Sequence, residues 1–233
     1  AIPTTAGTGT EADPWSVITN EEVKEKIGFG SPLTFPALSI IDPELMVSIP
    51  PHLTAYQGFD AFFHAAEGFL ANCATPISDL YALEAIRLLY KYLPVAVKDG
   101  RNLKARAKVA WASTLAGLVE STSCCISEHS MEHAMSAYYP QLPHGAGLIA
   151  LSEAYFETFR HDCTKRYMKM AEIMTQQKSN RPSDFIDALV RMQKECNVYQ
   201  LKLSDWGVKP EDFPKMVQNA RDTMGSLFTL DPH

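Results

Sequence analysis

Long hydrophobic runs, basic tracts and CxxC cysteine pairs are all missing from this 233-residue sequence. No apolar run approaches the roughly 20 residues that a membrane-spanning helix needs, so we expect no membrane partner. The net charge is −6 and the lysines and arginines are scattered, which argues against nucleic-acid binding. The five cysteines are odd in number, which is typical of a reduced cytoplasmic protein. We expect the adjacent Cys124 and Cys125 to be small buried hydrophobic residues, with a redox-active pair as the alternative.

The opening residues also lack an initiator Met and the charged and apolar regions of a signal peptide. Residue 1 leads directly into a Gly/Thr-rich segment. We therefore expect that further chain precedes Ala1 in the natural protein.

The hydrophobic pattern changes near residue 50. Residues 1–12 are typical of a turn-rich loop, and short strands are predicted at 15–20, 26–30 and 38–43. From the Pro50-Pro51 pair onward, apolar residues recur at i, i+3 and i+4, which predicts helices. These are expected at residues 53–69, 77–91, 102–121, 127–137, 145–159, 163–176, 182–196 and 210–224. The sequence predicts a mainly α fold, with a short β element in residues 1–50 and a helical domain over residues 51–233.

Two pairs of metal-type ligands lie far apart in the chain, each spaced for one face of a helix. Asp60 precedes His64 by four residues, His129 precedes His133 by four, and His144 follows. Residues four apart on a helix project in nearly the same direction. One carboxylate and two or three imidazoles that converge make a divalent-metal site, and the mixed oxygen and nitrogen donors suit iron or zinc.

The alternative is a set of ordinary buried polar residues. A lone histidine is usually hydrogen-bonded in the core or on the surface, and an Asp60–His64 hydrogen bond would satisfy both groups. Four of the seven histidines nevertheless fall in these two places, which favours a metal. The spacing alone leaves both interpretations open.

The Thr/Gly loop, residues 4–11, is a second candidate site. Glycines let backbone N–H groups approach an anion, and threonine hydroxyls add donors. The loop lacks the Lys-Ser/Thr ending of a P-loop and does not match GxGxxG, so an ordinary flexible loop is the alternative.

Together these segments resemble the iron-containing (group III) alcohol dehydrogenase family. The resemblance covers nearly the whole chain in the right order, and its motifs are residues 2–11, 41–45, 53–67, 79–86, 115–117 and 142–145. It implies the two-domain architecture of dehydroquinate synthase. An N-terminal α/β domain would bind NAD or NADP, a helical domain would hold the metal, and the active site would lie between them. Residues 1–50 would then be the end of the cofactor domain.

The resemblance also implies roles for individual residues. The metal, Fe²⁺ with Zn²⁺ as the alternative, would be held by Asp60, His64, His129 and His144. The catalytic residue would be His133, beside the metal and near substrate and nicotinamide, where it could relay a proton. The cofactor would contact Thr4, Thr5 and Thr8, and its ribose or phosphate side would be within reach of Lys26.

Two features depart from the family pattern. The Gly-rich pyrophosphate loop of the cofactor domain is absent, so we expect a fragment or a cleaved product. Pro140 also lengthens the segment between His129 and His144 by one residue. Without a gap, Ser130 would take the place of His129, but serine is a poor metal ligand and we retain His129.

We expect an NAD(P)-linked oxidoreductase that transfers hydride between a primary alcohol and nicotinamide. Its partners would be a small alcohol or aldehyde and a second copy of the chain, as a homodimer. One alternative is a non-catalytic metal-binding domain or oligomerisation unit that lacks the nucleotide domain. Another is a relative of glycerol dehydrogenase or dehydroquinate synthase, although residues 4–11 and 58–67 favour the iron-type alcohol dehydrogenases.

Overall fold

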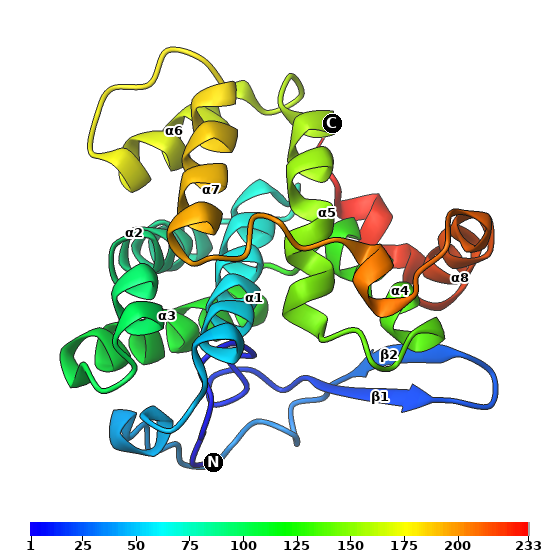
Figure 1. The fold of residues 1–233 in the computed structure, drawn as a ribbon, viewed down its shortest axis with the longest axis horizontal. Helices are drawn as coiled ribbons and strands as arrows, with labels where there is room; N and C mark the ends of the chain where they lie inside the picture. The colour runs from blue at the N-terminus through cyan, green and yellow to red at the C-terminus, as the bar shows by residue number, and fades with distance from the viewer. Residues whose placement is uncertain (233) are drawn as a thin grey trace.

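Helices make up most of the computed structural model, which describes residues 1–232 (Figure 1). The helices are α1 (Pro51–Leu70), α2 (Pro76–Lys98), α3 (Leu103–Thr122), α4 (Ser127–Tyr138), α5 (His144–Phe159), α6 (Thr164–Thr175), α7 (Ser183–Glu195) and α8 (Phe213–Met224). Short 3-10 helices are η1 (Pro43–Met46), η2 (Leu203–Trp206), η3 (Pro210–Asp212) and η4 (Gly225–Leu230), and the strands are β1 (Ser16–Asn20) and β2 (Glu25–Phe29). The predicted mainly α fold with a short β element is confirmed.

The two strands form an antiparallel hairpin in which Ser16 pairs with Phe29. The third predicted strand, residues 38–43, is wrong. Outside the turn that Asp42 forms with Leu45, its backbone bonds only to residue 1 among the described residues: Ile40 N donates to Ala1 O at 3.0 Å, and the Ala1 amino group donates to Leu38 O at 2.5 Å. Asp42 then accepts a hydrogen bond from Glu44 N and starts η1, so the segment turns instead of extending.

Helix α2 shows how local chemistry sets an element's bounds. Thr75 and Ser78 form a reciprocal capping box, and Pro76 occupies the first turn, where its missing N–H leaves no bond unmade. The helix continues through Pro94 to Lys98, beyond the predicted end at residue 91. Leu93, Ala96 and Val97 explain the extension, because they are buried in the core.

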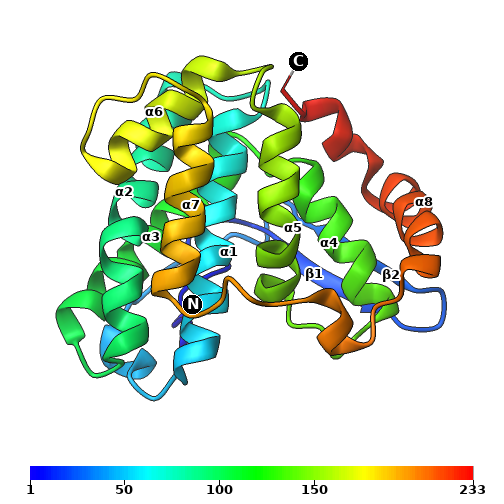
Figure 2. The same ribbon diagram turned by 45° about the horizontal axis from the view of Figure 1, so that its top comes forward.

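Helix α1 runs through the middle of the molecule, surrounded by α2, α3, α5 and α7 (Figure 2). Phe59, Phe62 and Phe63 are fully buried. The Phe62 ring stacks on Phe185 of α7, and the Phe63 ring stacks on Phe156 of α5. These aromatic residues are core, and they carry Asp60 and His64 of the same helix into the interior.

The hairpin lies beside α4 and α8, away from α2 and α3 (Figure 1). None of the helices in residues 1–232 has, by itself, the length and apolar composition that a membrane span requires. Only α3 and α4 taken together meet that criterion by length and composition, and a bend of 106° separates them. The expected division into domains at residue 50 stays a prediction.

Candidate metal centre

Three helices bring the four predicted metal ligands to one point. Asp60 and His64 lie one turn apart on α1, His129 is on α4, and His144 is the first residue of α5. Asp60 Oδ1 lies 3.7 Å from His64 Nε2, 3.6 Å from His129 Nε2 and 3.2 Å from His144 Nε2. The structure therefore gathers residues that are up to 84 positions apart in the sequence.

These separations fit a metal ion. Bonds of about 2.0–2.2 Å in a tetrahedral arrangement place neighbouring ligand atoms about 3.3–3.6 Å apart. Within residues 1–232, neither Asp60 Oδ1 nor His129 Nε2 has a hydrogen-bond partner, although both are buried. A buried carboxylate oxygen and a buried ring nitrogen left facing each other are the donor set that a cation would satisfy. The residues present fit an Fe²⁺ or Zn²⁺ site.

Ser130, the alternative to His129, is engaged elsewhere. Its Oγ donates to Ala220 O of α8 at 2.9 Å. This contact, together with the position of His129 Nε2, supports His129 as the ligand.

Each of two histidines in the cluster has a buried carboxylate behind it. His129 Nδ1 is hydrogen-bonded to Glu67, and His144 Nδ1 is hydrogen-bonded to Glu132. Both glutamates are fully buried. Such partners set the orientation of a metal-bound imidazole. The sequence analysis missed these roles, although Glu67 follows His64, and Glu132 follows His129, at the helical spacing of three residues.

The electrostatics of the cluster follow from these pairs. Burial alone lowers the pKa of His129 and His144, but Glu67 and Asp60 outweigh it at His129, and Glu132 and Asp60 outweigh it at His144, so both pKa values are raised. Burial raises the pKa of Asp60, but the surrounding histidines more than offset this and hold it well below its usual range. The carboxylates therefore stabilise positive charge at this point.

His133 lies beside the cluster and is buried. Its ring centre is 5.4 Å from that of His144 and 6.4 Å from that of His129. Its Nδ1 lies 2.9 Å from Met224 Sδ of α8. Burial, reinforced by the nearby His144 and Lys26, lowers the pKa of His133 well below its usual range, so its imidazole is neutral near pH 7.

Lys26 reaches the cluster from strand β2. Its Nζ donates to Glu132 Oε2 at 3.2 Å and to Ser136 Oγ at 2.8 Å, and it lies 3.4 Å from His144 Nδ1. The Glu132 carboxylate thus contacts both the Lys26 ammonium and the His144 imidazole. Burial raises the pKa of Glu132, but His144 and Lys26 outweigh this and lower it to about 2.

The Thr/Gly loop rests on α1 and α3 through its small residues. A Cβ added at Gly7 would lie 3.0 Å from Asp60 Oδ2. Gly9 has a φ of +65° and packs against Gly117 of α3, where a side chain on either residue would overlap the other's backbone. The threonines predicted to bind cofactor, Thr4, Thr5 and Thr8, are exposed on this loop.

The cysteine pair shows no sign of redox chemistry. Cys124 and Cys125 are half-buried, and neither forms a disulfide within the described chain. Burial and the neighbouring Glu120 raise the pKa of the Cys125 thiol well above its usual range. A raised pKa disfavours the reactive thiolate.

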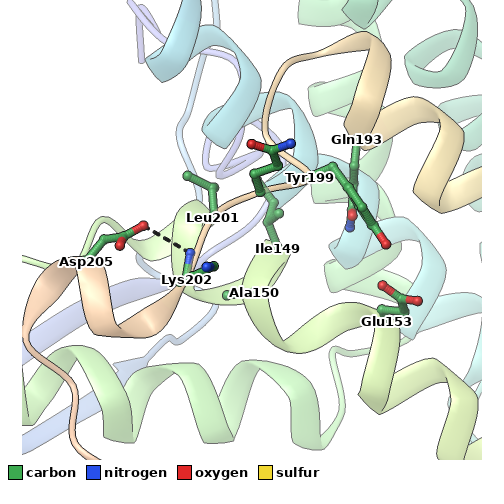
Figure 3. Close-up of a pocket in the computed structure, with 9 residues that line it drawn as sticks. Ile149, Ala150, Glu153, Gln193, Tyr199, Leu201, Lys202 and Asp205 are labelled. Atoms are coloured by element: carbon green, nitrogen blue, oxygen red, sulfur yellow. Dashed lines mark hydrogen bonds between the residues drawn. The ribbon is translucent and has the colours of Figure 1, made fainter.

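A surface pocket of about 620 Å³ lies apart from the metal ligands. Its lining comes from α5, α7 and the segment that follows α7, and includes Glu153, Gln193 and Tyr199. Figure 3 shows Lys202 hydrogen-bonded to Asp205 at its edge. None of the predicted site residues lines this pocket.

Comparisons with known proteins give matches over most of the chain. A family model described as the C-terminal part of the Fe-containing alcohol dehydrogenase family matches residues 54–229, and one described as iron-containing alcohol dehydrogenase matches residues 1–43. The choline dehydrogenase of Bacillus subtilis (strain 168) is 44% identical over 150 residues, which are 64% of this chain and 37% of that protein. The NAD-dependent methanol dehydrogenase of Bacillus methanolicus is 34% identical over 226 residues, covering 94% of this chain and 58% of the relative.

Among solved structures, an archaeal halo-thermophilic alcohol dehydrogenase from a Red Sea brine pool superimposes with a TM-score of 0.96 at 35% identity. The match covers 100% of this chain and 60% of that chain. This chain thus spans 58–60% of these two longer matches.

Proposed function

Because this chain belongs to the iron-containing alcohol dehydrogenase family, we propose that it is the metal-holding part of an alcohol dehydrogenase. The reaction is hydride transfer between a primary alcohol and NAD or NADP. One observation carries this proposal: three imidazole Nε2 atoms converge within 3.7 Å of the buried Asp60 Oδ1. This favours a metal site over four separately satisfied polar residues.

The ligands are Asp60, His64, His129 and His144, and the ion is Fe²⁺, with Zn²⁺ as the alternative. When bound, the metal supplies Lewis-acid polarisation of the substrate oxygen, and the nicotinamide accepts or returns the hydride. Asp60 provides the single negative charge among these ligands. The imidazoles of His64 and His129, which are both buried, shield it from water.

His133 is the proton-relay residue. Its Nδ1–H donates to Met224 Sδ, which leaves Nε2 free to accept a proton. The lowered pKa keeps this ring neutral and able to act as a base near pH 7. Its place beside the ligand histidines, outside the set that faces Asp60, supports this role.

Residues 1–50 belong to the cofactor-binding α/β domain and residues 51–233 to the catalytic domain. Thr4, Thr5 and Thr8 contact the cofactor through their exposed hydroxyls, and Lys26 contacts its ribose or phosphate side. Exposed apolar side chains are concentrated in residues 1–50, including Leu33 and Leu38, and this supports a further packing partner for that segment.

The substrate is a small alcohol or aldehyde, and the working assembly is a homodimer in the cytoplasm. Cysteines that are all free within the described residues support a reducing compartment. Light scattering of the purified protein tests the dimer.

Metal analysis of single variants tests the site. The chain is loaded anaerobically with Fe²⁺ and, separately, with Zn²⁺. We expect about one metal per chain in the unmodified protein and in His133→Ala, and almost none in Asp60→Ala or His144→Ala, because removing a ligand opens the set of four. The exposed His161→Ala is the matched control and should bind as the unmodified chain does.

Two results contradict the proposal. If the unmodified chain binds no stoichiometric metal, the four residues do not form the site. If His133→Ala loses metal as completely as His144→Ala, the roles of these two histidines are wrongly assigned.

A further inference from the structure

Glu132 lies where α4, α5 and β2 meet, and its side chain is fully buried. Its Oε2 accepts hydrogen bonds from His144 Nδ1 and from Lys26 Nζ. Its Oε1 is buried without a hydrogen-bond partner among residues 1–232. Burying a carboxylate costs free energy unless hydrogen bonds and opposite charges compensate for the lost water. The buried position of Glu132 therefore indicates a role for its two partners.

Helix α5 makes room for this carboxylate. Gly147 lies three residues after His144, and a Cβ added there would be 2.9 Å from both Glu132 Cγ and Glu132 Oε1. A larger residue at position 147 would displace the glutamate from beside His144. The glycine and the glutamate therefore form one packed unit around the first turn of α5.

His144 depends on such a contact more than the other ligands do. Its side chain is 28% exposed, against 3% for His129 and 11% for His64. It is also the first residue of its helix, and its ring is less enclosed than those of His129 and His64. A hydrogen bond to a fixed acceptor restrains the orientation of this ring.

We propose that Glu132 is the positioning residue for His144, holding the proton on Nδ1 so that the Nε2 lone pair faces the metal. The inference rests on the proposed function, because it presupposes a metal at Asp60. An imidazole has two ring nitrogens, and the hydrogen bond made by one decides which of them is free to bind a metal. A carboxylate partner also raises the basicity of the ligand nitrogen.

A structural role makes a different prediction. If Glu132 serves only to tie the hairpin to α4 through Lys26, then removal of either partner should have the same effect. If it positions His144, removal of the carboxylate should weaken metal binding, whereas Lys26→Met should not, because the His144–Glu132 hydrogen bond survives.

Zinc affinity of the purified chain, measured by competition with a chromophoric chelator, separates the two. We expect the zinc affinity to fall about 100-fold in Glu132→Ala. It should fall only about 10-fold in Glu132→Gln, because the amide oxygen can still accept a hydrogen bond from His144 Nδ1–H. In Lys26→Met the zinc affinity should stay within about threefold of that of the unmodified chain. Glu153→Gln, an exposed glutamate on α5, is the matched control and should be unchanged. Circular dichroism confirms that each variant folds, and Glu132→Gln carries the test if Glu132→Ala does not.

Nitrogen-15 NMR of the zinc-loaded chain adds a measurement that would not change if Glu132 only held the hairpin against α4. The His144 Nδ1–H signal should be present in the unmodified chain and in Lys26→Met, and lost in Glu132→Ala. The inference is overturned if both Glu132 variants bind zinc within about threefold of the unmodified chain, or if Lys26→Met weakens binding as much as Glu132→Ala. If the unmodified chain and Glu153→Gln bind no zinc, the proposed metal site itself fails, and the inference fails with it.

Discussion

Gly117 on α3 is the point at which the Thr/Gly loop rests on the helical body. A Cβ added there would overlap the Gly9 carbonyl oxygen and lie 2.9 Å from the Gly9 carbonyl carbon. Carbon atoms in contact sit about 3.5–4.0 Å apart, and the carbonyl oxygen is closer still, so in Gly117→Ala the loop must move by at least about 0.5–1 Å. The obstructing atoms are backbone and cannot rotate away as a side chain would.

Two opposing effects decide the magnitude. Overpacking costs typically about 1–3 kcal/mol, and a backbone obstruction belongs at the upper end of that range. Alanine in a helix interior regains about 1 kcal/mol over glycine. The free energy of unfolding of Gly117→Ala should therefore fall by about 2 kcal/mol, which lowers the Tm of a chain of this size by about 4–8 °C.

Urea and thermal unfolding followed by far-ultraviolet circular dichroism measure this change. Gly225→Ala is the control, because an added Cβ there has nothing within 4 Å, and its stability should change by less than about 0.5 kcal/mol. Helix propensity alone predicts that Gly117→Ala is more stable than the unmodified chain. A variant of equal or greater stability would therefore refute the close approach of loop and helix.

Two further stability predictions concern buried residues. Burial raises the pKa of Asp13 to about 7, so over the range from about pH 4 to pH 7 the folded chain holds a proton that the unfolded chain has released, and stability falls as the pH rises. Asp13→Asn should thus match the unmodified chain in urea unfolding at pH 4 and be more stable by a few kcal/mol at pH 8; equal stabilisation at both pH values would contradict this. Phe62→Ala removes a fully buried ring that stacks on Phe185 and should cost about 3–5 kcal/mol in the same assay, and a loss below about 1 kcal/mol would show that the core around α1 is loosely packed.

Much of the helical body was predictable because its signals are local. Apolar spacing over residues 53–69 and 145–159 located α1 and α5 to within two residues at each end. The predicted start at residue 77 lies one residue from the observed start of α2, which Thr75 caps and Pro76 begins. The strand predicted at residues 38–43 was wrong, because an apolar run closed by proline resembles a strand but a strand also needs a partner strand. Among the described residues, the backbone of this segment bonds to Ala1 and, within a local turn, to Leu45.

The metal ligands were predictable to the extent that their spacing was. Asp60 and His64 share a helix face by periodicity alone, and so do His129 and His133. Periodicity does not say which member of the second pair points at the first. In the structure His129 Nε2 lies 3.6 Å from Asp60 Oδ1, while His133 Nδ1 is beside Met224 of α8. Only the resemblance to a family separated their roles in advance.

Local features of the chain are enough to predict the helices, the candidate ligands and the family, because periodicity, capping and motif order are properties of neighbouring residues. The groups that lie behind the ligands follow only from tertiary packing. Nothing in the local sequence distinguishes Glu67 and Glu132 from other glutamates in helices. Their roles come from their contacts in the folded chain: Glu67 with the His129 imidazole, and Glu132 with the His144 imidazole and the Lys26 ammonium. Contacts between such distant segments depend on how the helices cross, and no local pattern records that.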